Sequence, residues 1–100
     1  MNDPVLSRLG LSRRANFLAV GTEAVKTALQ KRKAHLLVLA QDISAKSEKE
    51  FRFLSGGKVP VVRLDADLET VGAAIGVRAG ILAVTDEGMA KAILAAVQQP

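Results

Sequence analysis

The sequence has 100 residues, 49% of them hydrophobic, a formal net charge of +4 and no Cys, Trp or Tyr, and a chain of this length predicts a single domain, residues 1–100. The absence of cysteine excludes disulfides, thiolate nucleophiles and cysteine-ligated zinc, and the one histidine, His35, cannot hold a metal ion alone. Because no apolar stretch approaches the roughly 20 residues of a membrane-spanning helix and the N-terminus lacks the apolar centre of a signal peptide, we expect a cytoplasmic protein.

Helix and strand patterns alternate from the N-terminus onwards. Asp3-Pro4 is typical of an N-cap followed by proline at the first helical position, which predicts a helix from Pro4 to about Arg14. The stretch "FLAV", residues 17–20, is too short for a helix and predicts a strand. Thr22 is expected to cap the next helix with its hydroxyl. The residues that this second helix would bury are Val25, Ala28 and Leu29.

The middle of the chain predicts two strands with a helix between them. "HLLVLA", residues 35–40, is a continuous apolar run without alternation, which indicates a strand covered on both faces. "VPVVRL", residues 59–64, predicts a third strand, with Pro60 at its start or on an edge because proline cannot donate a ladder hydrogen bond. Gly56-Gly57 would end the intervening helix. The residues at helical spacing in that helix are Ile43, Ser47, Phe51 and Leu54.

The last third predicts a short helix, a strand and a final helix. Asp67 is expected to cap the short helix, and Gly72 on its inner stripe would let another backbone approach closely. "ILAV", residues 81–84, is the fourth strand, followed by a cap at Thr85 or Asp86. The residues expected to face inward are Leu68, Val71 and Ile75 in the short helix and Met89, Ile93, Ala96 and Val97 in the last. This alternation predicts an α/β fold, a three-layer α/β/α sandwich around a four-stranded mixed sheet.

Catalytic chemistry is hard to assemble from this sequence. Asp65 and Asp67 could flank a metal ion, but a loop acid and a helix cap are the favoured interpretation, and His35 suits a surface position. The glycines form neither a dinucleotide-binding pattern nor a phosphate loop. We therefore expect no enzyme, no metal ion and no cofactor, and an enzyme would have only these three residues and Asp42 to use.

The charge distribution favours a polyanionic partner. Residues 1–33 have a net charge of +5, whereas residues 64–100 have a net charge of −3, which suggests one positive face. A mixed, evenly solvated surface is the alternative. The helix that starts after Gly21 would offer free N–H donors to a phosphate, although Gly21 could also simply make the turn. The cations expected on one side of the fold with Gly21 are Lys26, Lys31, Lys33 and Arg78.

Aromatic residues are too scarce for single-strand recognition by stacking to be expected. The chain contains three Phe and no other aromatic side chain apart from His35, and proteins that bind single strands usually stack bases on exposed rings. A structured RNA, recognised by its shape and its backbone, fits the residues better.

The order of motifs "LGLSRRANFLAVGTEAV", "LLVLAQDIS", "VPVV" and "AIGVRAGILAVTDEGMAKAI" resembles the bacterial YlxQ-like proteins, over about Leu9 to Ile93. These belong to the ribosomal-protein superfamily of kink-turn RNA binders, of the L7Ae and L30e types. The resemblance implies a three-layer α/β/α sandwich and three RNA-contacting elements: the glycine-led start of the second helix, the end of the second strand and the loop before the last strand. The corresponding residues here are Gly21, Thr22, Glu23 and Lys26, then Ala40, Gln41 and Asp42, then Val77, Arg78, Ala79 and Gly80.

The base-reading residues of the superfamily differ in this chain. Kink-turn binders resemble one another in a G-x-N-E-x-x-K pattern, and this chain has Glu23 at the Asn position, Ala24 at the Glu position and Lys26 one position early. The resemblance implies a small, non-catalytic, monomeric RNA-binding protein associated with the ribosome or with translation, with altered kink-turn specificity. The alternative function is a protein–protein interaction module on the same fold.

Overall fold

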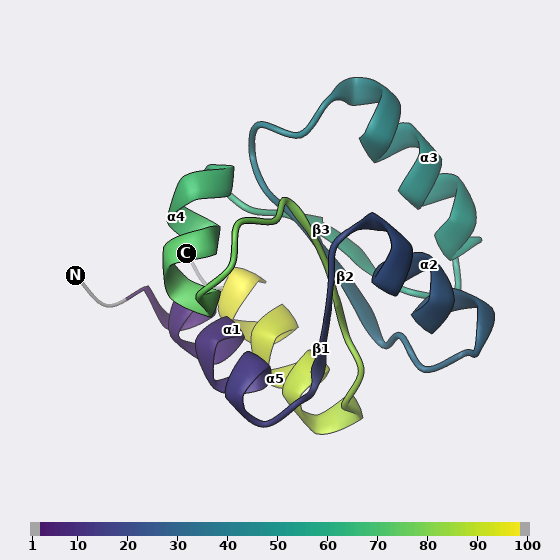
Figure 1. Cartoon of the computed structure of the whole chain (residues 1–100). Helices are drawn as coiled ribbons and strands as arrows, with labels where there is room; N and C mark the ends of the chain where they lie inside the picture. The colour runs from purple at the N-terminus through teal and green to yellow at the C-terminus, as the bar shows by residue number, and fades with distance from the viewer. Residues whose placement is uncertain (1–2, 99–100) are drawn as a thin grey trace.

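The computed structural model describes residues 3–98, and in that range five helices alternate with four strands in the predicted order (Figure 1). The bounds of the elements are α1 Pro4–Arg14, β1 Leu18–Val20, α2 Thr22–Gln30, β2 Leu36–Leu39, α3 Ala45–Ser55, β3 Val61–Arg63, α4 Leu68–Ile75, β4 Ile81–Val84 and α5 Glu87–Gln98. The predicted order of elements is therefore confirmed; the first three strands are shorter than the apolar runs that predicted them, and β4 has the predicted bounds.

The strands form one mixed sheet in the order β1-β4-β2-β3. β4 is antiparallel to both of its neighbours, β1 and β2, whereas β3 is parallel to β2. Pro60 lies directly before β3, which is an edge strand, as its missing N–H requires. Because β4 runs against its neighbours, β1 and β2 end at the edge of the sheet where β4 begins.

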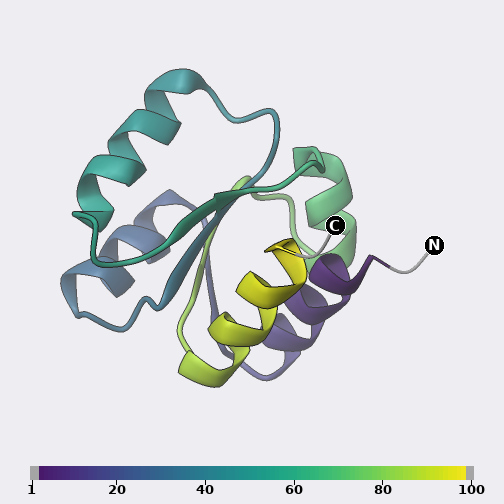
Figure 2. The same cartoon turned by 180° about the vertical axis from the view of Figure 1, so that it is seen from behind.

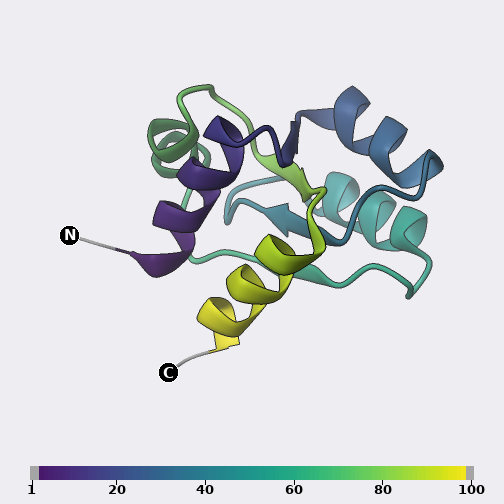
Figure 3. The same ribbon diagram turned by 90° about the horizontal axis from the view of Figure 1, so that it is seen from below.

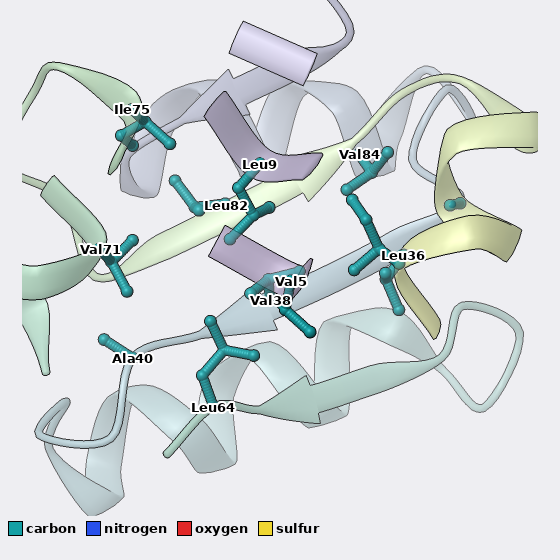
Figure 4. Packing of buried hydrophobic residues seen from close by; sticks show 12 residues of the cluster. Val5, Leu9, Leu36, Val38, Ala40, Leu64, Val71, Ile75, Leu82 and Val84 are labelled. Atoms are coloured by element: carbon teal, nitrogen blue, oxygen red, sulfur yellow. The ribbon is translucent and has the colours of Figure 1, made fainter. Parts of the chain in front are cut away.

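Helices cover both faces of this sheet, which confirms the three-layer α/β/α sandwich. Alternate residues of β2 belong to two separate apolar clusters, Leu36 and Val38 to one and Leu37 and Leu39 to the other. The first cluster packs against α1, α4 and α5, and Figure 4 shows its side chains converging on β2 and β4. The second packs against α2 and α3. Figure 3 shows these two helical layers on opposite sides of the sheet, and Figure 2 shows the α1, α4 and α5 layer from behind.

Side chains cap four of the helices. Asp3 and Asp67 accept backbone hydrogen bonds at the starts of α1 and α4, as predicted, and Ser44 does so for α3. Asp86, rather than Thr85, caps α5, because its carboxylate accepts from the N–H of Met89 at 2.8 Å.

Three local predictions differ from the structure. Thr22 was expected to cap α2, but it is the first helical residue, and Gly21 occupies the cap position. Leu54 was expected to face the core of the protein, but it is 42% exposed, and buried Ser55 takes the inner position beside Phe51. Ala90 is buried although the α5 pattern omitted it. α2 begins one residue before the predicted start and the buried side of α3 is rotated by about one residue, which are usual errors of such predictions, whereas α5 buries one residue more than its pattern included.

Candidate nucleic-acid interface

The turn between β1 and α2 requires glycine. Gly21 has φ 93° and ψ 166°, a backbone conformation that residues with a Cβ rarely adopt. Its N–H donates to the carbonyl of Ile81 at 2.9 Å, and its carbonyl accepts from the N–H of Val25 at 3.0 Å. A Cβ added at Gly21 would have no atom within 4 Å. The glycine therefore makes the turn and also leaves open space at the start of α2.

The start of α2 has no side-chain cap, unlike the other helices. Gly21 has no side chain to offer, and no hydrogen-bond acceptor among residues 3–98 contacts the N–H groups of Thr22, Glu23 and Ala24. Free N–H groups in the first turn carry the positive end of the helix dipole. They are suited to an anion, and a phosphate group is a strong ligand for such a position.

A shallow groove of about 410 Å³ lies at this helix start. Four segments that are distant in sequence form it: the start of α2, the segment that follows β2, the first residue of α4 and the loop that precedes β4. They meet because β1 and β2 end at the edge of the sheet where antiparallel β4 begins. The residues lining the groove are Gly21, Thr22, Asp42, Ile43, Ser44, Ser47, Leu68, Arg78, Ala79, Gly80 and Ile81. We call this the α2 groove.

Asp42 and Gly80 hold the walls of the α2 groove together. The carboxylate of Asp42 accepts from the N–H of Leu68 at 2.9 Å, which fixes the segment after β2 to the start of α4. A Cβ added at Gly80 would lie 2.8 Å from Cγ2 of Ile43 and 3.2 Å from a Cδ of Leu68. Both residues were predicted as RNA contacts, and the structure gives each a positioning role within the protein.

Arg78 stands at the rim of the α2 groove, on the loop between α4 and β4. Its guanidinium lies 3.7 Å from the carboxylate of Glu69, and both side chains are about three-quarters exposed, 73% and 79%. An ion pair this exposed contributes little to stability. Arg78 can therefore exchange Glu69 for an incoming phosphate at little cost in stability.

The predicted cations do not all lie at the groove. Lys26 does not line it; its ammonium pairs with the Glu50 carboxylate of α3 at 3.4 Å and lies 6.0 Å from the centre of the Phe51 ring. Lys31 and Lys33 follow the other end of α2, away from Gly21. Figure 1 shows α2 running away from the turn that joins it to β1. Of the four cations expected on the side of Gly21, only Arg78 lines the groove, whereas Lys26 lies on α2 and the other two follow its far end.

Glu23 and Gln41 also lie outside the groove lining. Glu23 is exposed in the first turn of α2, and no cation of the described chain pairs with it. Gln41 contributes its backbone, because its N–H donates to Ala66 at 2.8 Å and its carbonyl accepts from the Arg63 side chain. The sequence reasoning missed Ser44 and Ser47, although a serine a few residues after a buried strand is itself a helix-cap signal.

The scarcity of aromatics predicted few exposed rings, yet two of the three Phe are exposed, with Phe53 at 82% and Phe17 at 36%.

Within residues 3–98 no three His, Asp or Glu side chains gather into a possible metal site. No helix in the same range is long and apolar enough to cross a membrane.

Comparisons with known proteins show which family and which fold this chain resembles. The family model described as the ribosomal protein L7Ae/L30e/S12e/Gadd45 family matches residues 3–94. A solved structure from Bacillus halodurans, described as a protein with unknown function, is 28% identical to this chain with a TM-score of 0.92. The match covers 98% of this chain and 100% of that one. A search of curated proteins found no match.

Proposed function

The chain belongs to the ribosomal protein L7Ae/L30e/S12e/Gadd45 family, which makes it a protein of the RNA-binding ribosomal type, and we propose that it binds structured RNA in the α2 groove. In this proposal the protein is non-catalytic and acts with the ribosome or with another part of the translation machinery. The phosphate backbone of the RNA approaches the start of α2, and the loop of residues 76–80 closes on it from the other side.

The observation that carries the proposal is the uncapped start of α2. The free N–H groups of Thr22, Glu23 and Ala24 lie beside a residue without a side chain, so that a phosphate can approach the helix axis directly. Hydrogen bonds from backbone N–H groups to a charged acceptor are stronger than those to neutral acceptors. The helix dipole adds to this attraction.

Arg78 supplies the mobile charge of the site in this proposal. It exchanges its exposed partner Glu69 for a phosphate, and the backbone of its loop is held close to α4 at Gly72. No aromatic ring lines the α2 groove, so that bases are not expected to stack within it. Contacts to phosphate and sugar groups remain, and they suit a folded RNA that is recognised by shape.

The direct test is to recover the protein from its own cells and sequence the RNA that accompanies it, with and without nuclease treatment. We expect a small set of structured RNAs, protected over a defined segment. Arg78→Gln should reduce recovery of this set. Arg13→Gln, which makes the same charge change at an exposed position of α1, should not. Recovery of proteins that survive nuclease treatment, with no enriched RNA, would contradict the proposal and support a protein-interaction module.

A further inference from the structure

Phe53 is the most exposed large apolar residue of the described chain. It is 82% exposed on α3, whereas Phe51, two positions earlier, is 1% exposed and packs beneath α2. With about 100° between successive residues of a helix, Lys46, Lys49 and Phe53 occupy one stripe on the side of α3 that faces away from the sheet. We call these three residues the α3 stripe. It places one exposed ring and two lysines along the same side of the helix.

The acidic residues of α3 do not neutralise the α3 stripe. Glu48 pairs with Arg52 at 2.9 Å and with Arg63 at 3.2 Å. Glu50 pairs with Lys26 at 3.4 Å. Both acids are therefore engaged by other cations, and within residues 3–98 neither Lys46 nor Lys49 has an acidic partner within 4 Å.

The fold concentrates positive charge on the layer that carries the α3 stripe. Residues 21–63, which include α2 and α3, contain nine Lys and Arg against four Asp and Glu. The rest of the chain contains five against six. Because α2 and α3 lie together on one face of the sheet (Figure 3), this face has the positive potential that attracts a polyanion.

The helix that carries the α3 stripe begins at the α2 groove. Ser44, the cap of α3, and Ser47 line the groove, and α3 leads away from it (Figure 1). Lys46 lies in the first turn of α3, and Phe53 follows about 10 Å further along the helix axis. A nucleic-acid strand that leaves the groove along α3 would meet the two lysines first and the ring afterwards.

We propose that the α3 stripe binds an unpaired RNA segment that flanks the structured RNA in the groove. One base stacks on the face of Phe53, and Lys46 and Lys49 contact the phosphates between this base and the groove. Stacking accepts any base, because every base has a π face. The proposal rests on the proposed function and adds a second, single-stranded element to the RNA that this protein recognises.

The test uses one structured RNA in two forms, blunt and with a single-stranded tail, titrated against the full chain at fixed salt. The RNA is the one recovered with the protein. The tailed form should bind more tightly than the blunt form. Phe53→Ala should lower affinity for the tailed form about tenfold and leave the blunt form unchanged, since removal of one stacking ring commonly has that effect. Phe53→Leu, which keeps apolar surface without a π face, should lower affinity nearly as much.

A second measurement uses the absence of Trp from this sequence. Phe53→Trp introduces a single indole on the exposed face of α3, so that its fluorescence reports stacking directly. The tailed RNA should quench it strongly and the blunt RNA weakly. Replacing both Lys46 and Lys49 by Gln should weaken the binding of the tailed RNA only and should make that binding less dependent on salt. Thermal unfolding of each variant checks that the exposed substitutions leave the fold intact.

The outcomes separate this inference from the proposed function. If neither form of the RNA binds, the proposed function fails. If both forms bind equally and Phe53→Ala changes neither affinity, the α3 stripe is not an RNA contact, although the groove still is. Full affinity in Phe53→Leu contradicts stacking and indicates a general apolar contact. A change from dimer to monomer in Phe53→Ala, without loss of RNA affinity, assigns the ring to a protein contact instead.

Discussion

Gly72 of α4 packs directly against Arg78, so that a Cβ at Gly72 would lie 3.1 Å from the Cα of Arg78 and 3.2 Å from the carbonyl oxygen of Val77. The absence of a side chain at Gly72 therefore decides how close the loop before β4 lies to α4. Because this loop forms one wall of the α2 groove, Gly72 controls the position of the Arg78 guanidinium even though glycine itself has no side chain to contact a ligand.

Gly72→Ala should separate RNA affinity from stability. Alanine gains about 1 kcal/mol of helix propensity over glycine, and this gain offsets the crowding of the loop. We expect the free energy of unfolding to change by less than about 1 kcal/mol, while RNA affinity falls several-fold because the loop moves by a few tenths of an ångström. Urea unfolding and an RNA titration measure the two effects. Unchanged affinity would show that the loop position does not matter for binding.

Two other glycines predict opposite effects of the same substitution. A Cβ at Gly10 would lie 2.8 Å from the carbonyl oxygen of Ala74, where α1 crosses α4, whereas a Cβ at Gly88 would meet only the Asp86 carboxylate at 3.4 Å. Gly10→Ala should destabilise the protein by about 1–3 kcal/mol, because two backbones must separate. Gly88→Ala should stabilise it by up to about 1 kcal/mol. Urea midpoints of both variants decide the matter, and equal shifts would contradict the packing argument.

Asp67 predicts a pH dependence of stability. Hydrogen bonding from the Thr70 side chain and from the Thr70 backbone N–H holds the pKa of Asp67 below its ordinary value of 3.8. Because the folded pKa is the lower one, the carboxylate stabilises the fold at pH values above 3.8, and this stabilisation is lost as the pH falls through the folded pKa.

Asp67→Asn tests this pH dependence, because asparagine can cap the helix but does not ionise. The wild type should be the more stable protein near pH 6, and the difference should shrink on acidification through the pKa of Asp67. Urea unfolding of both proteins across this range is the measurement. A difference that stays constant with pH would mean that the Asp67 charge adds nothing to its role as a cap.

Lys31 and Lys33 predict a contact that is electrostatic without being selective. They lie past the end of α2 that is remote from the α2 groove, on the positive face of the protein. Replacing both by Gln should reduce the slope of log affinity against log salt concentration by about 0.7–0.9 for each phosphate that is no longer neutralised. The same change should weaken the binding of all RNAs equally. Replacing Arg8 and Arg13 by Gln makes the same charge change on α1. If both double variants behave alike, neither face is preferred.

The fold was predictable because its signals are local. Asp3-Pro4, Asp67 and the glycines at positions 56 and 57 mark helix ends by their own chemistry, and the unbroken run 36–39 marks a strand covered on both faces. The error at Thr22 has a physical reason. A threonine that follows a glycine can be either a cap or the first helical residue, and only the φ of 93° at Gly21 decides between them.

The candidate site was predictable only in part, because a groove depends on contacts between distant segments. The resemblance assigned three of the segments that form it, including Gly21, Asp42 and Arg78, but not Leu68 of α4. It could not reveal that Lys26 pairs with Glu50, since that ion pair depends on how α2 packs against α3. The helical pattern did identify the buried Phe of α3, since Phe51 belongs to it and is 1% exposed whereas Phe53 does not and is 82% exposed.

Glu23 and Ala24 predict a loss of kink-turn specificity. Both side chains are exposed in the first turn of α2, where base-reading residues would stand. Lys26 is paired with Glu50, so that the Glu23 carboxylate stays uncompensated by it. Ionised Glu23 can only accept hydrogen bonds and Ala24 can make none, whereas an Asn would both donate and accept.

We therefore expect weak binding to a standard kink-turn, with little discrimination against a form whose sheared G·A pairs are replaced by Watson–Crick pairs. Removing one good polar interaction costs on the order of 1–3 kcal/mol, so that removing two weakens binding by roughly a hundredfold or more. Glu23→Asn combined with Ala24→Glu should restore part of the discrimination. Because both side chains are exposed, the double variant should unfold at nearly the temperature of the parent. Titrating both RNAs at fixed salt is the measurement. Tight and selective binding by the unmodified protein would show that other groove residues, with Arg78 foremost, read the base pairs.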